Sequence, residues 1–230
     1  MIESSAKDLI NEIFSNQFNR DGFIKFTNTL LYSASFQSSI IEGDDIPQIF
    51  KKHILSLECL ATYMDSNNKE IDLLIVNLLK DTALDRARTM QRNFIAQYLE
   101  SSSKNAALVA FVSPNVQHWR FSLIKIEAKI VGMEVETTLT PAKRWSFLVG
   151  KNEGCHTVKS QLIDILLDDT SAPSLNELEQ AFNIETVSKE FFDKYSNLFF
   201  RMKESLDVMV ETDQNLKNDF KEKGIDTADF

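Results

Sequence analysis

The first part of the chain has the apolar spacing of helices. Apolar residues recur at every third or fourth position, which is the repeat of a helix that is buried along one side. This spacing predicts a helix over residues 2–14 and a second helix for which Asp21 is the N-cap. We expect a polar loop over residues 33–45 and then a short helix from Pro47 to about Lys52.

From residue 55 the repeat changes to two, as in β-strands. Residues 55–63 alternate between apolar and polar types, so we predict a strand with one buried face. A polar turn over residues 65–69 follows, and residues 71–79 are then almost all apolar, as in a central strand that is covered on both sides. The two segments are predicted to form a β-hairpin.

The next segment predicts one helix and further strands. Thr82 opens a helix that runs to about Leu99, and Asp85 three residues later completes a weak capping box. Four stretches rich in β-branched and aromatic residues are then predicted to be strands: 107–112, 119–130, 133–139 and 144–149. Together these patterns indicate a mixed β-sheet that carries an internal helix.

The last third of the chain is again helical. A helix is predicted over residues 157–167, and Ser174 with Glu177 forms a capping box for the next one. A long helix is expected from residue 187 to beyond 210. Its apolar residues are spaced as in a coiled-coil seam, at Phe191, Tyr195, Leu198, Met202, Leu206 and Met209.

These elements define the fold class and the expected organisation. The fold class is α+β, with a central mixed sheet and an internal helix rich in arginine, flanked by N-terminal helices and a C-terminal helical region. We expect a helical region over residues 1–53, the sheet core over 54–150 and C-terminal helices over 151–230. Residues 226–230 have the pattern of a helix start, so we interpret the chain as a fragment of a longer one.

Composition narrows the class of protein. The chain has 43% apolar and 26% charged residues, which is typical of a globular protein. No apolar run reaches the roughly 20 residues of a membrane-spanning helix, and the N-terminus lacks the pattern of a signal peptide. Cys59 and Cys155 are too few for a disulfide framework and are not spaced as a zinc site. We therefore expect two thiols in a cytoplasmic protein.

Charge is distributed unevenly along the chain. The net charge is −9, yet residues 80–160 hold 12 Lys and Arg against 7 Asp and Glu, between two acidic ends. The helix predicted in this segment carries Arg86, Arg88 and Arg92, which are three of the seven arginines of the chain. Because a planar guanidinium group suits phosphate, one interpretation is a local anionic partner. The alternative is that these arginines pair with acidic side chains nearby.

A hairpin that leads into a helix is also the arrangement of carboxylate–lysine nucleases. In those enzymes an acid on one strand and an acid-x-lysine motif on the next hold a divalent metal such as Mg²⁺, which activates water. Here residues 77–79 are Asn-Leu-Leu where acid-x-lysine is expected, so we describe the core as nuclease-like and leave its activity open. Asp72 and Lys80 are the candidate catalytic residues of an irregular version, and Glu127 with Lys129 is a weaker second match. A structural ion pair of Asp72 is the alternative.

Other motifs are absent from the sequence. The three histidines have no metal-ligand spacing, so we predict no metal site from them. The sequence contains no glycine-rich dinucleotide fingerprint and no phosphate-binding loop. None of the four prolines are adjacent, which excludes the Asx-Pro-Pro-aromatic site of adenine methyltransferases. This chain is therefore not expected to methylate DNA by itself.

Several stretches between residues 18 and 210 resemble the N-terminal region of type IIG and IIS-like bacterial restriction–modification enzymes. In these large proteins one chain carries an adenine-specific DNA methyltransferase and often a nuclease part. The resemblance is a pattern of several short matches, at residues 71–76, 83–96, 107–112, 119–123, 139–150 and 187–192.

The resemblance implies a domain that precedes a methyltransferase domain, with the long helix leading into it. DNA and that downstream domain are then the partners, and S-adenosylmethionine is expected only in the downstream domain. Three functions follow: a degenerate nuclease-like domain that binds the DNA backbone, a non-catalytic module that docks on the methyltransferase, or an active Mg²⁺-dependent nuclease. The residues predicted to contact DNA are Arg86, Arg88, Gln91, Arg92, Lys143 and Arg144.

Overall fold

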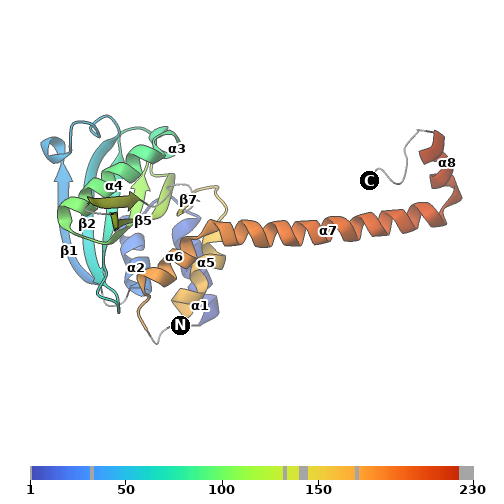
Figure 1. Cartoon of the computed structure of the whole chain (residues 1–230), viewed down its shortest axis with the longest axis horizontal. Helices are drawn as coiled ribbons and strands as arrows, with labels where there is room; N and C mark the ends of the chain where they lie inside the picture. The colour runs from blue at the N-terminus through green and yellow to red at the C-terminus, as the bar shows by residue number, and fades with distance from the viewer. Residues whose placement is uncertain (1, 32–33, 132–133, 140–144, 169–170, 223–230) are drawn as a thin grey trace. The chain divides into compact units, whose positions relative to one another are not determined.

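The computed structural model describes residues 2–31, 34–131, 134–139, 145–168 and 171–222 (Figure 1). Contacts divide the chain into two compact units, Met1–Ile184 and Glu185–Phe230. This division differs from the three regions expected from the sequence. Segments from all three of those regions belong to the first unit.

A mixed β-sheet is the centre of the first unit. Its path follows the order β1-β2-β3-β4-β5-β6, and β7 pairs with β5 beside this path. All neighbours are antiparallel except β3 and β4, which are parallel. The bounds are β1 Ser35–Glu42, β2 Ile54–Met64, β3 Glu70–Leu78, β4 Ala106–Val112, β5 His118–Val131, β6 Glu134–Leu139 and β7 Ser146–Gly150.

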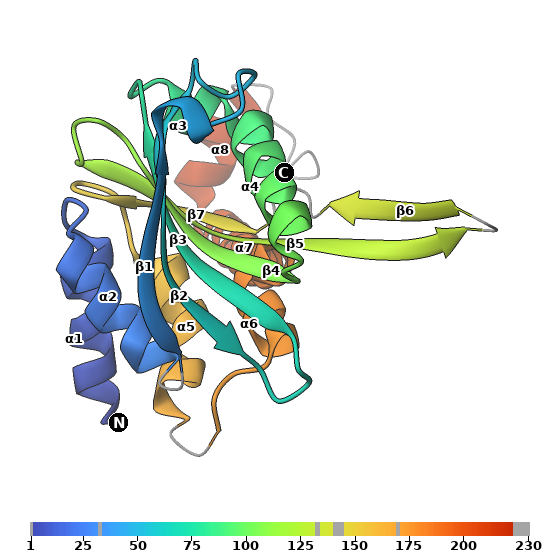
Figure 2. The ribbon, with the colours of Figure 1, turned by 90° about the vertical axis from the view of Figure 1, so that its left-hand side faces the viewer.

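Helices cover both faces of the sheet, which confirms the expected fold class (Figure 2). The crossover from β3 to β4 contains α3 (Ala83–Arg86) and α4 (Arg88–Ser102), and α4 packs on β4 and β5. The opposite face is covered by N-terminal and C-terminal helices together. They are α1 Glu3–Phe14, α2 Arg20–Leu30, α5 His156–Leu167 and α6 Leu175–Phe182.

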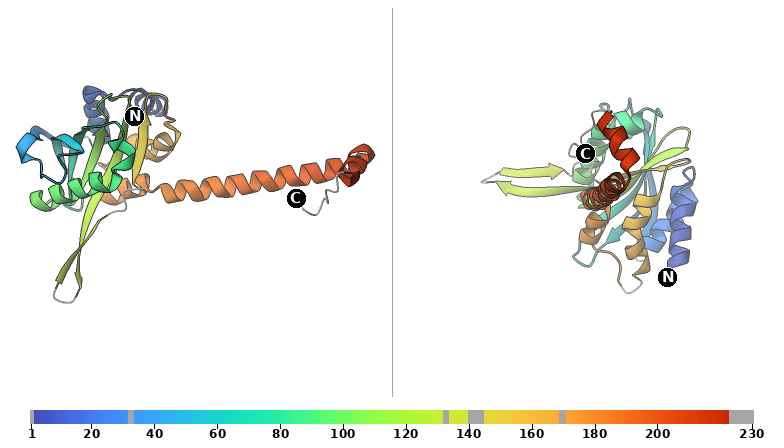
Figure 3. Two further views of the ribbon diagram at one scale, coloured as in Figure 1. Left: turned by 90° about the horizontal axis from the view of Figure 1, so that it is seen from above. Right: turned by 90° about the vertical axis from the view of Figure 1, so that its right-hand side faces the viewer.

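Strand β5 pairs with three other strands. Its residues 118–122 pair with β7, and residues 119–125 pair with β4. Beyond them, residues 126–131 pair with β6 alone, so β5 and β6 extend from the sheet as a two-stranded ribbon (Figures 2 and 3). The expected strands at 107–112, 119–130, 133–139 and 144–149 are therefore present with small changes at their ends, in so far as their residues are described.

Three expectations for the N-terminal region are wrong. The segment that was expected to be a loop contains β1, an edge strand whose polar composition hides the strand pattern and whose register against β2 shifts between Phe36 and Ser39. The short helix expected from Pro47 is a series of turns instead. In addition, the side chain of Asn19, not that of Asp21, caps α2 by accepting a hydrogen bond from the backbone of Gly22.

Strand β2 differs from the simple alternation expected for it. Leu57 and Cys59 belong to the core on the α4 side, whereas Ala61 and Tyr63 belong to the core on the opposite side. The register of β2 against β3 shifts between Cys59 and Ala61. An extra residue at such a bulge moves the following side chains to the other face, which explains the change.

The second unit contains α7 (Ile184–Thr212), which enters it from the end of the first unit, and α8 (Gln214–Glu222). The long C-terminal helix expected from the sequence is therefore present. Large apolar side chains that are more than half exposed line α7: Phe191, Phe192, Tyr195, Leu198, Phe199, Phe200, Met202, Leu206, Val208 and Met209. Within the described residues, no helix is long and apolar enough to cross a bilayer.

Candidate functional site

The arginine-bearing segment is two helices that meet at Ala87. Helix α3 ends there, and α4 begins at Arg88 without a capping side chain. The side-chain amide of Gln91 donates hydrogen bonds to the carbonyl oxygens of Ala83 at 2.7 Å and Leu84 at 3.3 Å. Because Gln91 is buried, this bond pair fixes the junction and so the position of the arginines.

Asp85 lies between two arginines from different elements. Its Oδ1 accepts hydrogen bonds from the guanidinium groups of Arg88 at 3.1 Å and of Arg120 at 2.8 Å. Arg120 belongs to β5 and also donates to Oγ of Ser146 at 3.3 Å. The sheet and the helix therefore contribute one guanidinium group each to a common carboxylate.

Arg92 adds a third guanidinium group on the same side of the sheet. It lies one turn after Arg88 on α4, and its group donates only to Oδ1 of Asn93 among the residues that the structure describes. Arg88, Arg92 and Arg120 line one small cavity of about 10 Å³, which has room for a single water molecule. Three cationic groups thus lie close together, and the carboxylate of Asp85 bonds to two of them, those of Arg88 and Arg120.

Two of these arginines have unused hydrogen-bonding capacity. Within the described part of the chain, the buried Nε atoms of Arg88 and Arg120 have no hydrogen-bond partner. An unpaired buried donor on a charged group is costly, so an anion that reached it would be bound favourably.

The electrostatics of Arg120 show the same excess of positive charge. Burial is the first cause that lowers the pKa of Arg120, and repulsion from Arg88 is the second. The attraction of Asp85 opposes both effects without cancelling them. A further negative charge near these groups would relieve the repulsion between the two guanidinium groups.

The predicted DNA-contacting residues have different positions. Arg86 is exposed at the end of α3, and no described residue bonds to its guanidinium group. Gln91 is buried and its amide is used within the fold, so we correct its assignment from DNA contact to structural support. Lys143 and Arg144 lie outside the described residues.

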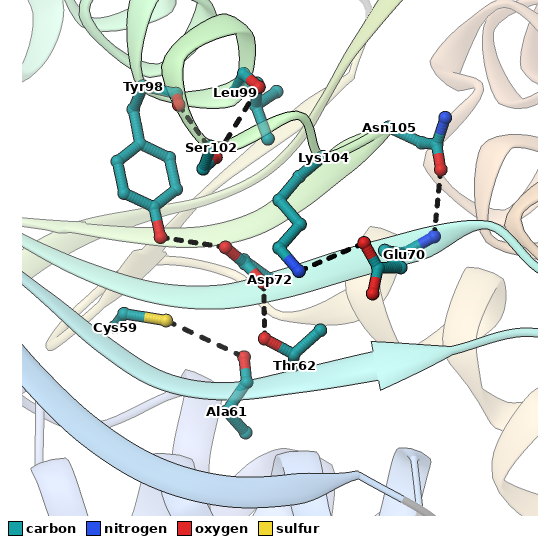
Figure 4. Close-up of polar contacts among 10 residues, drawn as sticks. All are labelled: Cys59, Ala61, Thr62, Glu70, Asp72, Tyr98, Leu99, Ser102, Lys104 and Asn105. Atoms are coloured by element: carbon teal, nitrogen blue, oxygen red, sulfur yellow. Dashed lines mark hydrogen bonds and ion pairs between the residues drawn. The ribbon is translucent and has the colours of Figure 1, made fainter.

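Asp72 lies in a buried hydrogen-bond network between β2, β3 and α4 (Figure 4). Its Oδ1 accepts a hydrogen bond from Oγ1 of Thr62 at 2.7 Å, and its Oδ2 accepts one from the hydroxyl of Tyr98 at 2.8 Å. Burial and then this hydrogen bond raise the pKa of the Tyr98 hydroxyl. Burial likewise raises the pKa of the nearby Cys59 thiol.

The structure does not bring Asp72 and Lys80 together. Lys80 follows the far end of β3, eight positions from Asp72, which corresponds to roughly 26 Å along an extended chain. Both carboxylate oxygens of Asp72 are already engaged and the residue is 1% exposed, so this carboxylate does not fit Mg²⁺ binding. Beside it, Glu70 forms an ion pair with Lys104 at 3.0 Å (Figure 4).

The second nuclease match is not described at the level of side chains. Glu127 and Lys129 lie in the ribbon of β5 and β6, where only the backbone is described. Among the described residues, no three His, Cys, Asp or Glu side chains are close enough to hold a metal ion.

Arg120 is the site residue that the sequence reasoning did not identify. Arg120 lies between Trp119 and Phe121, whose rings both belong to the core on the other face of the sheet. The available signal is that Arg120 and Ser122 alternate with the apolar residues Trp119, Phe121 and Leu123 in β5. The proximity of Arg120 to Arg88 depends on the packing of α4 on β5, which cannot be derived from the sequence pattern.

Comparisons with known proteins do not extend this description. No protein-family model matches the chain, and neither the curated proteins nor the solved structures include a significant match.

Proposed function

We propose that this chain is a nuclease-like, non-catalytic domain that binds the DNA backbone, as part of a bacterial restriction–modification protein in the cytoplasm. In this proposal an adenine-specific methyltransferase domain follows it and binds S-adenosylmethionine. The observation that carries the proposal is the group of three guanidinium groups, those of Arg88, Arg92 and Arg120, which line one cavity. Arg88 and Arg120 bond to a single carboxylate, that of Asp85, whereas Arg92 bonds to the amide of Asn93.

Physical chemistry favours a phosphate partner for such a group. Arginine donates several hydrogen bonds from one plane, which matches the oxygens of a phosphodiester. Contacts of this kind position a protein on a duplex without reading its sequence. Arg86, which is exposed near the start of α4, adds positive charge beside the group. Backbone binding without base recognition is therefore the function that this geometry supports.

The proposal is tested by duplex DNA binding of the chain and of two double variants. Arg88→Glu/Arg92→Glu reverses two charges at the site, and Lys7→Glu/Lys25→Glu reverses two exposed charges on α1 and α2, over the other face. We expect the first variant to lose at least about 10-fold in affinity and the control to change less than about 3-fold. Equal losses in both variants would reject the site, because only net charge would then matter.

The exposed apolar residues of α7 favour a second function, an interaction module that docks on the methyltransferase domain. Exposed apolar surface of this extent is typical of a protein-binding surface. Substituting Leu198 and Met202 with Lys in the full-length protein tests it. Faster cleavage of the methyltransferase domain by limited proteolysis in that variant supports docking, and an unchanged digestion pattern rejects it.

An active nuclease has no comparable support, since Asp72 and Lys80 lie apart.

A further inference from the structure

We infer that Arg88, Arg92 and Arg120 form a seat for a single phosphate group, in which a phosphate oxygen replaces Oδ1 of Asp85 between Arg88 and Arg120. This inference rests on the proposed function and deepens it, because it assigns one specific phosphate position within a general basic surface. It also gives Asp85 a role: when no phosphate is bound, its carboxylate is the counter-ion that keeps the guanidinium groups of Arg88 and Arg120 in position.

The contacts of Asp85 define where an anionic oxygen is bound. One atom, Oδ1, accepts from both Arg88 and Arg120, at 3.1 and 2.8 Å. Two guanidinium groups that converge on one oxygen form the same arrangement that a phosphate oxygen requires. The carboxylate therefore marks a position that a stronger anion can occupy.

Burial shows which partner leaves when an anion arrives. The side chain of Asp85 is 59% exposed, whereas that of Arg120 is 7% exposed and lies on the sheet. Rehydrating an exposed carboxylate costs little, while moving the buried guanidinium group would disturb the packing of α4. Arg88, with 38% of its side chain exposed, connects the buried group to the solvent.

The number of donors selects phosphate over a simple carboxylate. A carboxylate has two oxygens, and Asp85 uses only one of them on the two arginines. A phosphate group presents its oxygens tetrahedrally, so a second oxygen can accept from Arg92, which lines the same cavity as Arg88 and Arg120. Three positive charges against one negative charge leave an excess that fits a phosphate of either one or two negative charges.

Inorganic phosphate is the direct probe. Its binding to the chain is measured by calorimetric titration, with chloride at equal ionic strength as the reference. We expect saturation at one phosphate per chain. Arg88→Ala and Arg120→Lys are each expected to weaken binding about 10-fold or more, since each loses a charge-assisted bond pair. The control is Lys25→Ala, which removes an exposed cation on α2, over the other face of the sheet, and is expected to bind phosphate as the wild type does.

A second measurement tests the displacement of Asp85. Asp85→Asn removes the competing charge, so we expect phosphate to bind about 3- to 10-fold more tightly and to raise the melting temperature of this variant more than that of the wild type. The control is Asp81→Asn, which removes an equal charge nearby from a side chain that, among the residues the structure describes, accepts a hydrogen bond only from the backbone of Asn115. Equal effects of the two variants would overturn the displacement and with it the inference.

The outcomes separate the seat from the proposed function. Phosphate binding that depends on Arg88 and Arg120 in a chain with no DNA affinity supports the seat and rejects the DNA-binding proposal. The opposite result is also possible: Arg88→Glu/Arg92→Glu weakens DNA binding, while phosphate does not saturate and Arg120→Lys has no effect. That result supports the DNA-binding proposal and overturns the phosphate seat. Comparing duplexes with 5′-phosphate and 5′-hydroxyl ends identifies which phosphate of DNA is bound. Tighter binding of the 5′-phosphate duplex indicates a terminal phosphate, and equal binding indicates an internal phosphodiester.

Discussion

The two faces of the sheet are built from different chemistry. The face under α1, α2, α5 and α6 buries a cluster of aromatic rings, with Phe121 in contact distance of Phe14, Phe23, Phe26 and Phe182. The face under α4 has an apolar core as well, but it also buries Asp72, Gln91 and Arg120. Burying such groups opposes stability unless every one is bonded. The first face is therefore stabilised by aromatic packing, and the second also holds the guanidinium group of Arg120, which we propose to bind phosphate.

The largest effect is expected from the aromatic face. Phe121→Ala should lower the free energy of unfolding by about 3 to 5 kcal/mol, because it leaves a cavity among packed rings. Denaturant titration measures this change. Ile40→Ala, on the exposed side of the edge strand β1, is the control and should change the value by less than about 0.5 kcal/mol. A small loss of unfolding free energy in Phe121→Ala would mean that the aromatic rings are not the main core of the protein.

The Asp72 network should give an intermediate effect that depends on pH. Tyr98→Phe should cost about 1 to 2 kcal/mol at neutral pH, because Oδ2 of Asp72 loses its donor. The pKa of Tyr98 is raised by folding, so its contribution is complete below the pKa of an unfolded tyrosine, about 10, and is lost as the pH rises above it.

The wild type should therefore lose more stability than Tyr98→Phe when the pH is raised from about 9 to about 11. Thermal unfolding across that range measures the difference. Parallel curves for the two proteins would show that Tyr98 does not bond to Asp72 as described.

Arg120 should show the opposite behaviour to Phe121. Arg120→Met replaces a buried charge with an apolar side chain of similar length, and Asp85 is exposed enough to be hydrated after the change. We expect the free energy of unfolding to stay within about 1 kcal/mol of the wild type or to rise. Phosphate and DNA binding should weaken in the same variant. A loss of stability comparable to that of Phe121→Ala would remove the contrast between the two faces.

The contrast also explains what the sequence could predict. Regular apolar repeats predicted β3, β4, β5, α5 and α7, because their burial follows the period of a single element. The edge strand β1 was missed because polar residues on an exposed strand carry no such period, and the bulge in β2 was missed because it depends on the pairing with β3. For these features the partner strand decides the structure.

The candidate site was predictable only in part for the same reason. Arg88 and Arg92 were found because they lie one turn apart on a single helix, so local spacing is sufficient. Arg120 joins them through the packing of α4 on β5, and Gln91 was misassigned because its burial depends on the break between α3 and α4. Asp72 was identified as unusual, but its partners Thr62 and Tyr98 come from other elements.

The salt dependence of duplex DNA affinity is the most direct test of the central claim that the arginines of α4 contact phosphates. Each phosphate contact contributes about 0.9 to the slope of log affinity against log salt concentration between about 50 and 200 mM. The account predicts that Arg88→Ala/Arg92→Ala lowers this slope by about 2 relative to the wild type, while the Lys7→Ala/Lys25→Ala control keeps it. Identical slopes for the wild type and both variants would contradict the account.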